Sequence, residues 1–234
     1  SKKKYCLWID NDLLNEALKI EEIKNRITEV RKYRSSKSSI NIKHIENSHQ
    51  FLTMTLANES LFFIPTVSSE KREYIPIGVF DKSMVVIDPN FAIYDAQPWL
   101  FGVLHSKMHM VWVDAVGGKL KTDYRYSAKL CYNTFPFPTL NEKQKESINQ
   151  YVFSILDERA KFPEKTLAWM YNPETMPAGL KQAHKELDLA IERIYRLAPF
   201  NSDEERLEYL FKLYDEMTKK ETLFAKEKKT KGKK

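Results

Sequence analysis

The sequence predicts an α+β fold in three parts: a leading helix, a mixed or antiparallel β-sheet region, and an all-helical C-terminal bundle. Three observations favour this order. Apolar residues recur at helical spacing near the start of the chain, short segments rich in β-branched and aromatic residues fill its middle, and helical spacing returns after the prolines of "FPFP" at 135–138. The chain has 234 residues, 42% of them hydrophobic, which is enough to bury a core in one or two domains.

The leading helix is expected over residues 12–33, and the serine-rich stretch at 35–39 is expected to end it. Its apolar face carries Leu14, Leu18, Ile20, Ile23, Ile27 and Val30. The overlapping segment 24–43 holds seven basic residues and a single acid. Such a local excess favours binding to a phosphate backbone, but a solvated helix face that runs into a flexible loop explains it equally well.

Strands are expected where short apolar segments alternate with turn-forming residues. These segments are residues 51–57, 60–67, 74–80, 84–88 and 91–95. Residues 98–118 have the pattern of a helix that leads toward a further strand, and the sheet is expected to continue to about residue 133. After Pro138, apolar residues at helical spacing predict helices over 140–161, 178–197 and 202–218.

The stretch "KLKTDYRYS" at 119–127 is the most informative part of the predicted sheet. As a single strand it places Lys119, Lys121, Asp123 and Arg125 on one face and aromatic residues on the other, since side chains alternate along a strand. Lysine can donate to the O6 and N7 atoms of guanine, and a carboxylate can accept from the N4 amine of cytosine. Lys121 and Asp123, about 6–7 Å apart along such a strand, would therefore suit one G·C pair. The alternative is an internal charge pair on a solvated face.

No catalytic or metal centre emerges from the sequence. His105 and His109 have the i, i+4 spacing of metal ligands on a helix, but no third ligand or glutamate base accompanies them, so packing or hydrogen bonding is the favoured interpretation. Neither a phosphate-binding loop nor a nucleophile motif is present. Cys6 and Cys131 form no disulfide framework, which favours a reduced intracellular protein. No apolar run approaches the roughly 18 residues of a membrane span.

The ends of the chain carry most of its net charge of +6, because residues 1–4 hold three lysines and residues 226–234 hold six. The tail at 226–234 is expected to be disordered. The chain begins with Ser1 rather than methionine, so we expect it to be part of a longer protein.

Five ordered blocks of the sequence form a recognisable set. They are "IPTVSSEKREYIPIGVF" (64–80), "AIYDAQPWLFGVLHSKMHMVWVDAVGGKLKTDYRYS" (92–127), "YNTFPFP" (132–138), "LDERAKFPEKTLAWMYNPETMPAGLKQAHKELDLAIERIY" (156–195) and "ERLEYLFKLYDEMT" (205–218). Together they resemble the C-terminal part of the MmeI-like (type IIL) restriction–modification proteins and their methyltransferase relatives. In that family an S-adenosylmethionine-dependent adenine-N6 DNA methyltransferase precedes a target-recognition domain and a helical C-terminal region.

The resemblance implies that this chain recognises duplex DNA without being an enzyme by itself. The implied division is a helical connector from an upstream methyltransferase domain (1–34), a DNA target-recognition domain (35–138), a helical C-terminal region (139–225) and a tail (226–234). The family's cofactor loop and N-P-P-[YF] motif do not occur here, so S-adenosylmethionine is expected in the parent protein and no cofactor in this chain. The parent would be a site-specific adenine-N6 methyltransferase of the bacterial cytoplasm, with or without endonuclease activity. The alternative is a protein-interaction or structural module without base contacts.

The resemblance also bears on individual residues. Lys121 and Asp123 match positions that family members vary as an acid–base pair, which favours base readout. Residues in blocks that family members share suit phosphate or groove contact better, because such contacts carry no sequence information. With the basic residues of the leading segment, the expected phosphate or groove contacts are Arg31, Arg34, Ser68, Ser69, Arg72, Lys107, Lys119 and Arg125.

Overall fold

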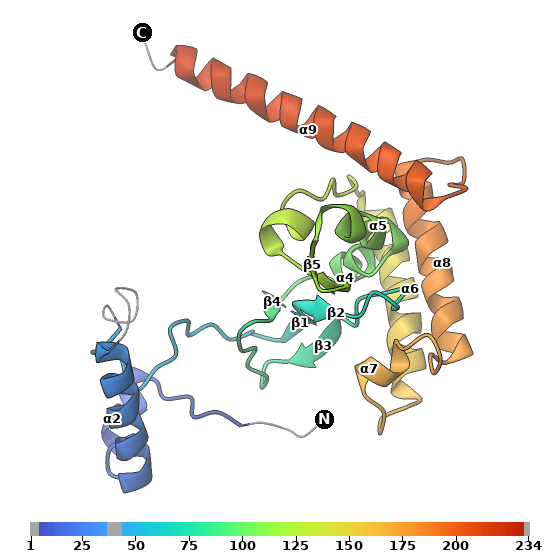
Figure 1. Cartoon of the computed structure of the whole chain (residues 1–234). Helices are drawn as coiled ribbons and strands as arrows, with labels where there is room; N and C mark the ends of the chain where they lie inside the picture. The colour runs from blue at the N-terminus through green and yellow to red at the C-terminus, as the bar shows by residue number, and fades with distance from the viewer. Residues whose placement is uncertain (1–4, 37–43, 232–234) are drawn as a thin grey trace. The chain divides into compact units, whose positions relative to one another are not determined.

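The structure is a computed structural model that describes residues 5–36 and 44–231, with the side chains of the last helix described through residue 219. The chain divides into two compact units, Ser1–Leu56 and Ala57–Lys234 (Figure 1). Within the described residues, no helix is long and apolar enough to cross a membrane. The predicted α+β class, with leading helices, antiparallel sheets and C-terminal helices, is confirmed.

The first unit contains a short 3-10 helix and two α-helices where the sequence predicts one helix over 12–33. They are η1 (Asn11–Leu13), α1 (Leu14–Ala17) and α2 (Glu21–Ser35). The break falls at Ile20, whose backbone is extended, and neither glycine nor proline marks it. Two acidic residues lie in the first turn of α2, where they favour a helix start. The helix ends at the serine-rich stretch as predicted, and residues 37–43 lie outside the described residues.

Arg34, near the end of α2, anchors the loop that follows. Its side chain is buried, with 7% of its surface exposed. The guanidinium donates hydrogen bonds to the backbone oxygens of His44 (2.8 Å), Asn47 (2.9 Å) and Gln50 (2.7 Å). Arg34 therefore has a structural role within the first unit, since charge-assisted bonds of this kind are among the stronger ones.

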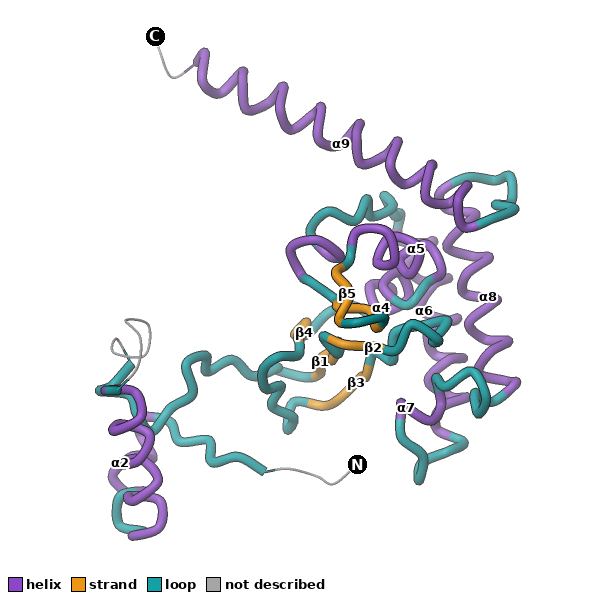
Figure 2. Tube along the Cα trace, viewed as in Figure 1, coloured by secondary structure: helices purple, strands orange, loops and turns teal. Residues whose placement is uncertain are grey.

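Two small antiparallel sheets form the β part of the second unit (Figure 2). The first has the strand order β3-β1-β4 and consists of β1 (Ser60–Ile64), β3 (Gly78–Asp81) and β4 (Phe91–Tyr94). The second has the order β2-β6-β5 and consists of β2 (Val67–Ser68), β5 (Gly118–Leu120) and β6 (Asp123–Arg125). The strands predicted at 51–57 and 84–88 are wrong, because β-favouring composition alone supplies no partner strand.

The helix predicted over 98–118 is present as two helices, α4 (Pro98–Leu104) and α5 (Lys107–Val116). The break falls where Ser106 acts as the N-cap of α5 and its hydroxyl accepts a hydrogen bond from the backbone N–H of His109 (3.4 Å). After β6 the sheet does not continue to residue 133 as predicted. A π-helical turn, η2 (Ala128–Tyr132), takes its place.

Four helices complete the second unit: α6 (Glu142–Ala160), α7 (Leu167–Met170), α8 (Ala178–Tyr195) and α9 (Asp203–Lys231). Figure 1 shows α6 and α8 side by side. The backbone of α9 is helical as far as Lys231, where the sequence predicts a disordered tail from residue 226. Residues 232–234 lie outside the described residues.

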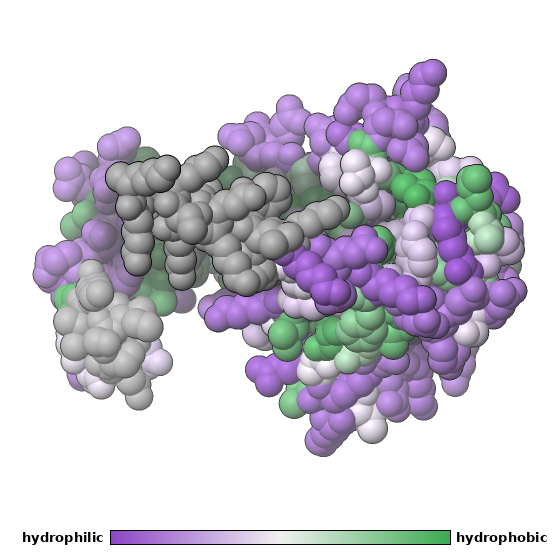
Figure 3. Space-filling view, turned by 90° about the horizontal axis from the view of Figure 1, so that it is seen from above, coloured by the Kyte–Doolittle hydropathy of each residue, from purple (hydrophilic) through white to green (hydrophobic). Residues whose placement is uncertain are grey.

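One hydrophobic core joins the sheet region to the C-terminal helices. Helix α4 approaches α6 closely at Gly102, where an added Cβ would lie 2.6 Å from Ile148 Cγ2. Phe101, Leu104, Ile148 and Leu187 are all fully buried there. On the face seen in Figure 3, by contrast, hydrophilic residues form most of the described surface and hydrophobic residues lie in separate patches.

A buried polar cluster centred on Arg159 of α6 crosses the same junction. Its guanidinium donates to the hydroxyl of Tyr171 (2.8 Å), to the carbonyl of Ile77 (2.9 Å) and to Nδ1 of His105 (3.4 Å). The Tyr171 hydroxyl in turn lies 2.8 Å from Nε2 of His184. Burial lowers the pKa of His105 and of His184 well below the usual range, and the charge of Arg159 adds to this effect, so both imidazoles are neutral at pH 7.

Asp188 of α8 ties the C-terminal helices to the start of α5. Its carboxylate accepts hydrogen bonds from the Tyr74 hydroxyl and from the Lys107 backbone N–H, both at 2.6 Å. Burial raises the pKa of Asp188 to about 7 in spite of these two donors.

Replacing Asp188 by asparagine is therefore expected to give a pH-dependent change in stability. The folded-state pKa of about 7 exceeds the unfolded value of 3.8, so the proton-linked stabilisation is fully present below pH 3.8 and is lost as the pH rises to 7. The free energy of unfolding of Asp188→Asn relative to wild type should rise by about 1.4 kcal/mol per pH unit up to pH 7 and then level off. Urea unfolding from pH 5 to 8 measures this, and Asp157→Asn, at an exposed position, serves as the baseline. A stability difference between Asp188→Asn and wild type that stays constant with pH would contradict the prediction.

Candidate nucleic-acid interface

The segment predicted to be one strand over 119–127 is a β-hairpin. Strands β5 and β6 pair antiparallel with Leu120 opposite Asp123, and Lys121 and Thr122 form the two-residue turn between them. Lys121 has a φ of 58°, as the first turn residue needs in one of the tight hairpin types. The prediction of a single strand is wrong because the chain reverses here without a glycine or asparagine to signal the turn.

The hairpin changes which side chains share a face. Residues directly opposite each other lie on the same face of a sheet, so Lys119 shares a face with Tyr124. Asp123 and Arg125 lie on the other face, and Lys121 is exposed at the tip between them. The predicted grouping of Lys119 with Asp123 and Arg125 is therefore wrong, whereas Lys121 and Asp123 remain close neighbours at the end of the hairpin.

Asp123 connects the hairpin tip to the loop that follows β2. Its carboxylate accepts a hydrogen bond from the backbone N–H of Glu70 at 3.4 Å. Ser69 is half-buried in that loop, and its hydroxyl accepts from the N–H of Lys71 at 3.4 Å. Ser68 is 2% exposed and its hydroxyl has no hydrogen-bond partner among the described residues. Of the two predicted serines, only Ser69 is accessible from the surface.

The basic residues near the hairpin divide into paired and unpaired cations. Lys119 is paired with Asp114 at 2.6 Å and lies over the Tyr124 ring, 3.9 Å from its centroid. Lys107 is paired with Asp203 at 2.8 Å. In the described part of the chain, no ion pair forms to Lys71, Arg72, Lys121 or Arg125. In the first unit, Arg31 lies 3.5 Å from Glu46 on the surface. Near the hairpin, the cations without an ion pair thus lie on the hairpin itself and on the loop after β2.

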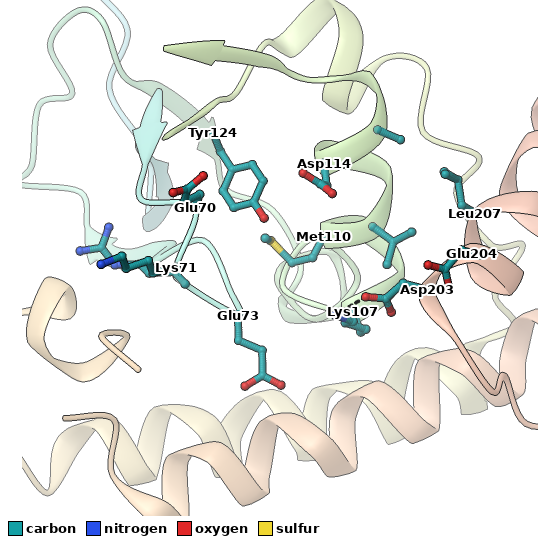
Figure 4. Close-up of a pocket in the computed structure, with 13 residues that line it drawn as sticks. Glu70, Lys71, Glu73, Lys107, Met110, Asp114, Tyr124, Asp203, Glu204 and Leu207 are labelled. Atoms are coloured by element: carbon teal, nitrogen blue, oxygen red, sulfur yellow. Dashed lines mark ion pairs between the residues drawn. The ribbon is translucent and has the colours of Figure 1, made fainter. Parts of the chain in front are cut away.

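A groove of about 410 Å³ lies between this loop, the hairpin, α5 and the start of α9 (Figure 4). Its lining residues are Glu70, Lys71, Arg72, Glu73, Lys107, Met110, Val111, Asp114, Ala115, Tyr124, Asp203, Glu204 and Leu207. Figure 4 shows Tyr124 and Met110 near its centre, with the pair of Lys107 and Asp203 at one edge. Acidic residues outnumber basic ones around this groove, so it does not favour phosphate.

His105 and His109 belong to the buried interior. Nε2 of His109 lies 3.0 Å from the Tyr126 hydroxyl, and burial lowers its pKa to about 3. His105 contacts Arg159 as described above. Among the residues that the structure describes, no group of three or more His, Cys, Asp or Glu side chains is placed to hold a metal ion.

Two family models cover nearly the whole chain. Residues 1–139 match the model of the MmeI target recognition domain, and residues 140–222 match that of the MmeI C-terminal domain. The chain belongs to the MmeI family. The solved structure of the type IIL restriction–modification enzyme MmeI in complex with DNA superimposes with a TM-score of 0.86 at 36% identity, over 92% of this chain and 29% of that one. This confirms the resemblance on which the sequence-based expectations rest.

A curated relative is also similar over most of the chain. DNA methyltransferase A of Bacillus subtilis (strain 168) is 47% identical, in a match that covers 93% of this chain and 25% of the relative. The chain thus spans about a quarter of the relative's length.

Two residues that the sequence analysis does not select lie beside those it does. Lys71 is an unpaired, exposed cation next to Arg72, and Asn172 lies across a second groove from both. Lys71 has a visible signal, since it stands in the block "SSEKRE" with three of the predicted residues. Asn172 has none, because it is 100 residues from Arg72 in the sequence and only the tertiary fold brings the two to one groove.

Proposed function

We propose that this chain recognises a specific sequence of duplex DNA for an S-adenosylmethionine-dependent adenine-N6 methyltransferase of the restriction–modification type. The observation that carries the proposal is the β5–β6 hairpin, which presents Lys121 at an exposed tip with Asp123 beside it, next to the loop that carries the unpaired Lys71 and Arg72. A cluster of cations without acidic partners suits a polyanion, because phosphates supply the missing counter-charge.

Base readout is assigned to the hairpin tip. Lys121 is placed to donate to guanine O6 and N7 and Asp123 to accept from the cytosine N4 amine of the same pair in the major groove. A two-stranded ribbon is narrow enough to enter that groove. The weak hydrogen bond from the Glu70 N–H leaves the second carboxylate oxygen of Asp123 available for a base.

Phosphate contact is assigned first to the unpaired residues Arg72 and Arg125, and to Ser69, which lies in the same loop as Arg72. Lys107, Lys119 and Arg31 are each paired with a surface acid and can exchange that partner for a phosphate at small cost, since exposed ion pairs contribute little. We leave out two of the expected residues, Arg34 and Ser68. The guanidinium of Arg34 already donates hydrogen bonds to backbone carbonyls, and Ser68 is buried, so neither side chain is accessible to a phosphate.

The remaining parts of the machinery are assigned to the rest of a longer protein. We propose that residues 1–34 connect to an upstream methyltransferase domain, that 35–138 recognise DNA, and that 139–225 form the helical C-terminal region. S-adenosylmethionine would bind the upstream domain, which acts on an adenine rotated out of the duplex. Such a protein works where the bacterial chromosome is, in the cytoplasm.

The proposal is tested by DNA binding of the full-length protein that contains this chain. Methylated adenines are first mapped to define the motif, and affinity for motif and scrambled duplexes is then measured from 50 to 200 mM salt. We expect affinity to fall linearly with salt on a logarithmic scale, and Arg72→Ala and Arg125→Ala each to reduce the slope by about 1. Lys212→Ala removes a lysine paired with Glu208 on α9 and serves as the control. Equal binding to both duplexes, or no effect of either arginine, would sink the proposal.

A further inference from the structure

We propose that the C-terminal helical region binds DNA directly, at a phosphate site that it shares with the recognition region. The site is a groove of about 400 Å³ lined by Ser69, Lys71, Arg72, Asn172, Pro173 and Glu174. Three of these residues come from the loop after β2 and three from the loop after α7. This inference rests on the proposed function, and it adds a second region of the chain to the DNA-binding surface.

The recognition side of the groove supplies two cations without partners. Neither Lys71 nor Arg72 forms an ion pair or a side-chain hydrogen bond within the described residues, and the Arg72 Nε is enclosed with its N–H unsatisfied. A buried donor without an acceptor is costly, so a ligand that brings acceptor oxygens is favoured. Figure 4 shows Lys71 pointing away from Met110 at the centre of the larger groove.

The helical side of the groove supplies an oriented neutral donor. Oδ1 of Asn172 accepts from the backbone N–H of Glu174 at 3.0 Å, which fixes the amide and leaves its Nδ2 group as the free end. That Nδ2 group donates to no other described residue. The backbone carbonyl of Asn172 also accepts from the N–H groups of Thr175 (3.0 Å) and Met176 (2.8 Å), so the whole turn is held in place.

The charge balance distinguishes this groove from the larger one. Lys71 and Arg72 line both grooves. In the smaller groove they face a single acid, Glu174, so its lining is net positive. Around the larger groove the acids are in excess. A phosphodiester is therefore attracted to the smaller groove, and Glu174 moderates the attraction.

The two sides of the groove are held together by the buried cluster at Arg159. Tyr171 precedes Asn172 in the chain and accepts from Arg159, which also donates to the Ile77 carbonyl of the recognition region. The loop that carries Asn172 is thus tied to the recognition region before DNA arrives, which lowers the entropic cost of binding a phosphate between the two sides of the groove.

The test measures binding of the full-length protein to its mapped motif and to a scrambled duplex. Lys71→Ala should weaken binding to both duplexes by about three- to tenfold and lower the salt slope by about 1. Asn172→Asp keeps the acceptor for the Glu174 N–H but replaces the donor by a charge, and it should weaken both more strongly. Glu174→Gln should tighten binding to both. Lys212→Ala on α9 is the charge-matched control and should change neither.

The proposal is overturned if Asn172→Asp and Glu174→Gln leave the affinities for both duplexes unchanged. It is also overturned if affinity falls only for the motif duplex, because that pattern indicates base readout. A fall in melting temperature of Asn172→Asp without a change in affinity also overturns it, since that is the mark of a purely structural turn. A wild-type protein that does not prefer its motif contradicts the proposed function itself. If the wild type prefers its motif but the groove variants bind with wild-type affinity, the phosphate site is contradicted and the proposed function is not.

Discussion

Replacing Arg159 by methionine is expected to lower the free energy of unfolding by about 3 kcal/mol or more, the largest single effect on stability that we predict. Arg159 is 7% exposed, and no acidic side chain among the described residues pairs with it. Its loss leaves the Ile77 carbonyl, the Tyr171 hydroxyl and His105 Nδ1 without their donor inside the core. Each unsatisfied buried group costs about 1–3 kcal/mol, and this sum exceeds the gain from no longer burying a charge.

Urea unfolding followed by tryptophan fluorescence measures this effect on the chain. The matched control is Arg193→Met, an arginine exposed on α8, which should change stability by no more than about 0.5 kcal/mol. Tyr171→Phe tests the same cluster by removing only the shared hydroxyl, and it should cost about 1–3 kcal/mol. If Arg159→Met unfolds within about 1 kcal/mol of wild type, the three acceptors find other donors and the cluster does not join the two regions.

The fold class could be predicted from the sequence, because the spacing of apolar residues in a helix or strand reflects which of its faces is buried. Helices α6, α8 and α9 follow apolar residues at helical spacing, and the antiparallel sheet region follows the short β-rich segments. The predicted strand at 51–57 failed for the opposite reason. A strand needs a neighbour, and whether one lies alongside is decided by tertiary structure that composition does not report.

The candidate site was only partly accessible. The residue types at Lys121 and Asp123 predict base readout, which stays a prediction, but alternation along a strand cannot reveal the chain reversal at Lys121 and Thr122. Likewise Arg34 looks like a surface cation in sequence, because its carbonyl partners are 10 to 16 residues away. Whether a cation is paired, enclosed or free is a property of packing, and this property separates the proposed phosphate contacts from the structural residues.

Exchanging the charges at the hairpin tip is expected to change the recognised sequence at one position. In the double variant Lys121→Glu with Asp123→Arg, a carboxylate replaces the lysine that donates to guanine, and an arginine replaces the aspartate that accepts from cytosine. The recognised G·C pair should therefore become C·G, with the rest of the motif intact. Each well-placed pair of bonds contributes about 1–3 kcal/mol of discrimination, roughly five- to 150-fold. Mapping methylated adenines across a genome for wild-type and variant full-length protein measures the change directly.

The hairpin geometry explains why this exchange should leave the fold intact. Lys121 is exposed in a turn, and Asp123 makes one long hydrogen bond to the Glu70 N–H, so neither side chain supports the core as Arg159 does. Lys119→Glu is the control for specificity, because Lys119 lies on the opposite face beside Tyr124. Loss of its proposed phosphate contact should weaken binding but leave the motif unchanged, since phosphate contacts carry no sequence information. An unchanged motif in the double variant would mean that the tip is a solvated turn. Loss of all methylation by a variant that still unfolds like wild type would mean that the tip contacts DNA without tolerating the reversed pair. Side chains can be exchanged to change specificity only where stability does not depend on them, and Lys121 and Asp123 meet that condition.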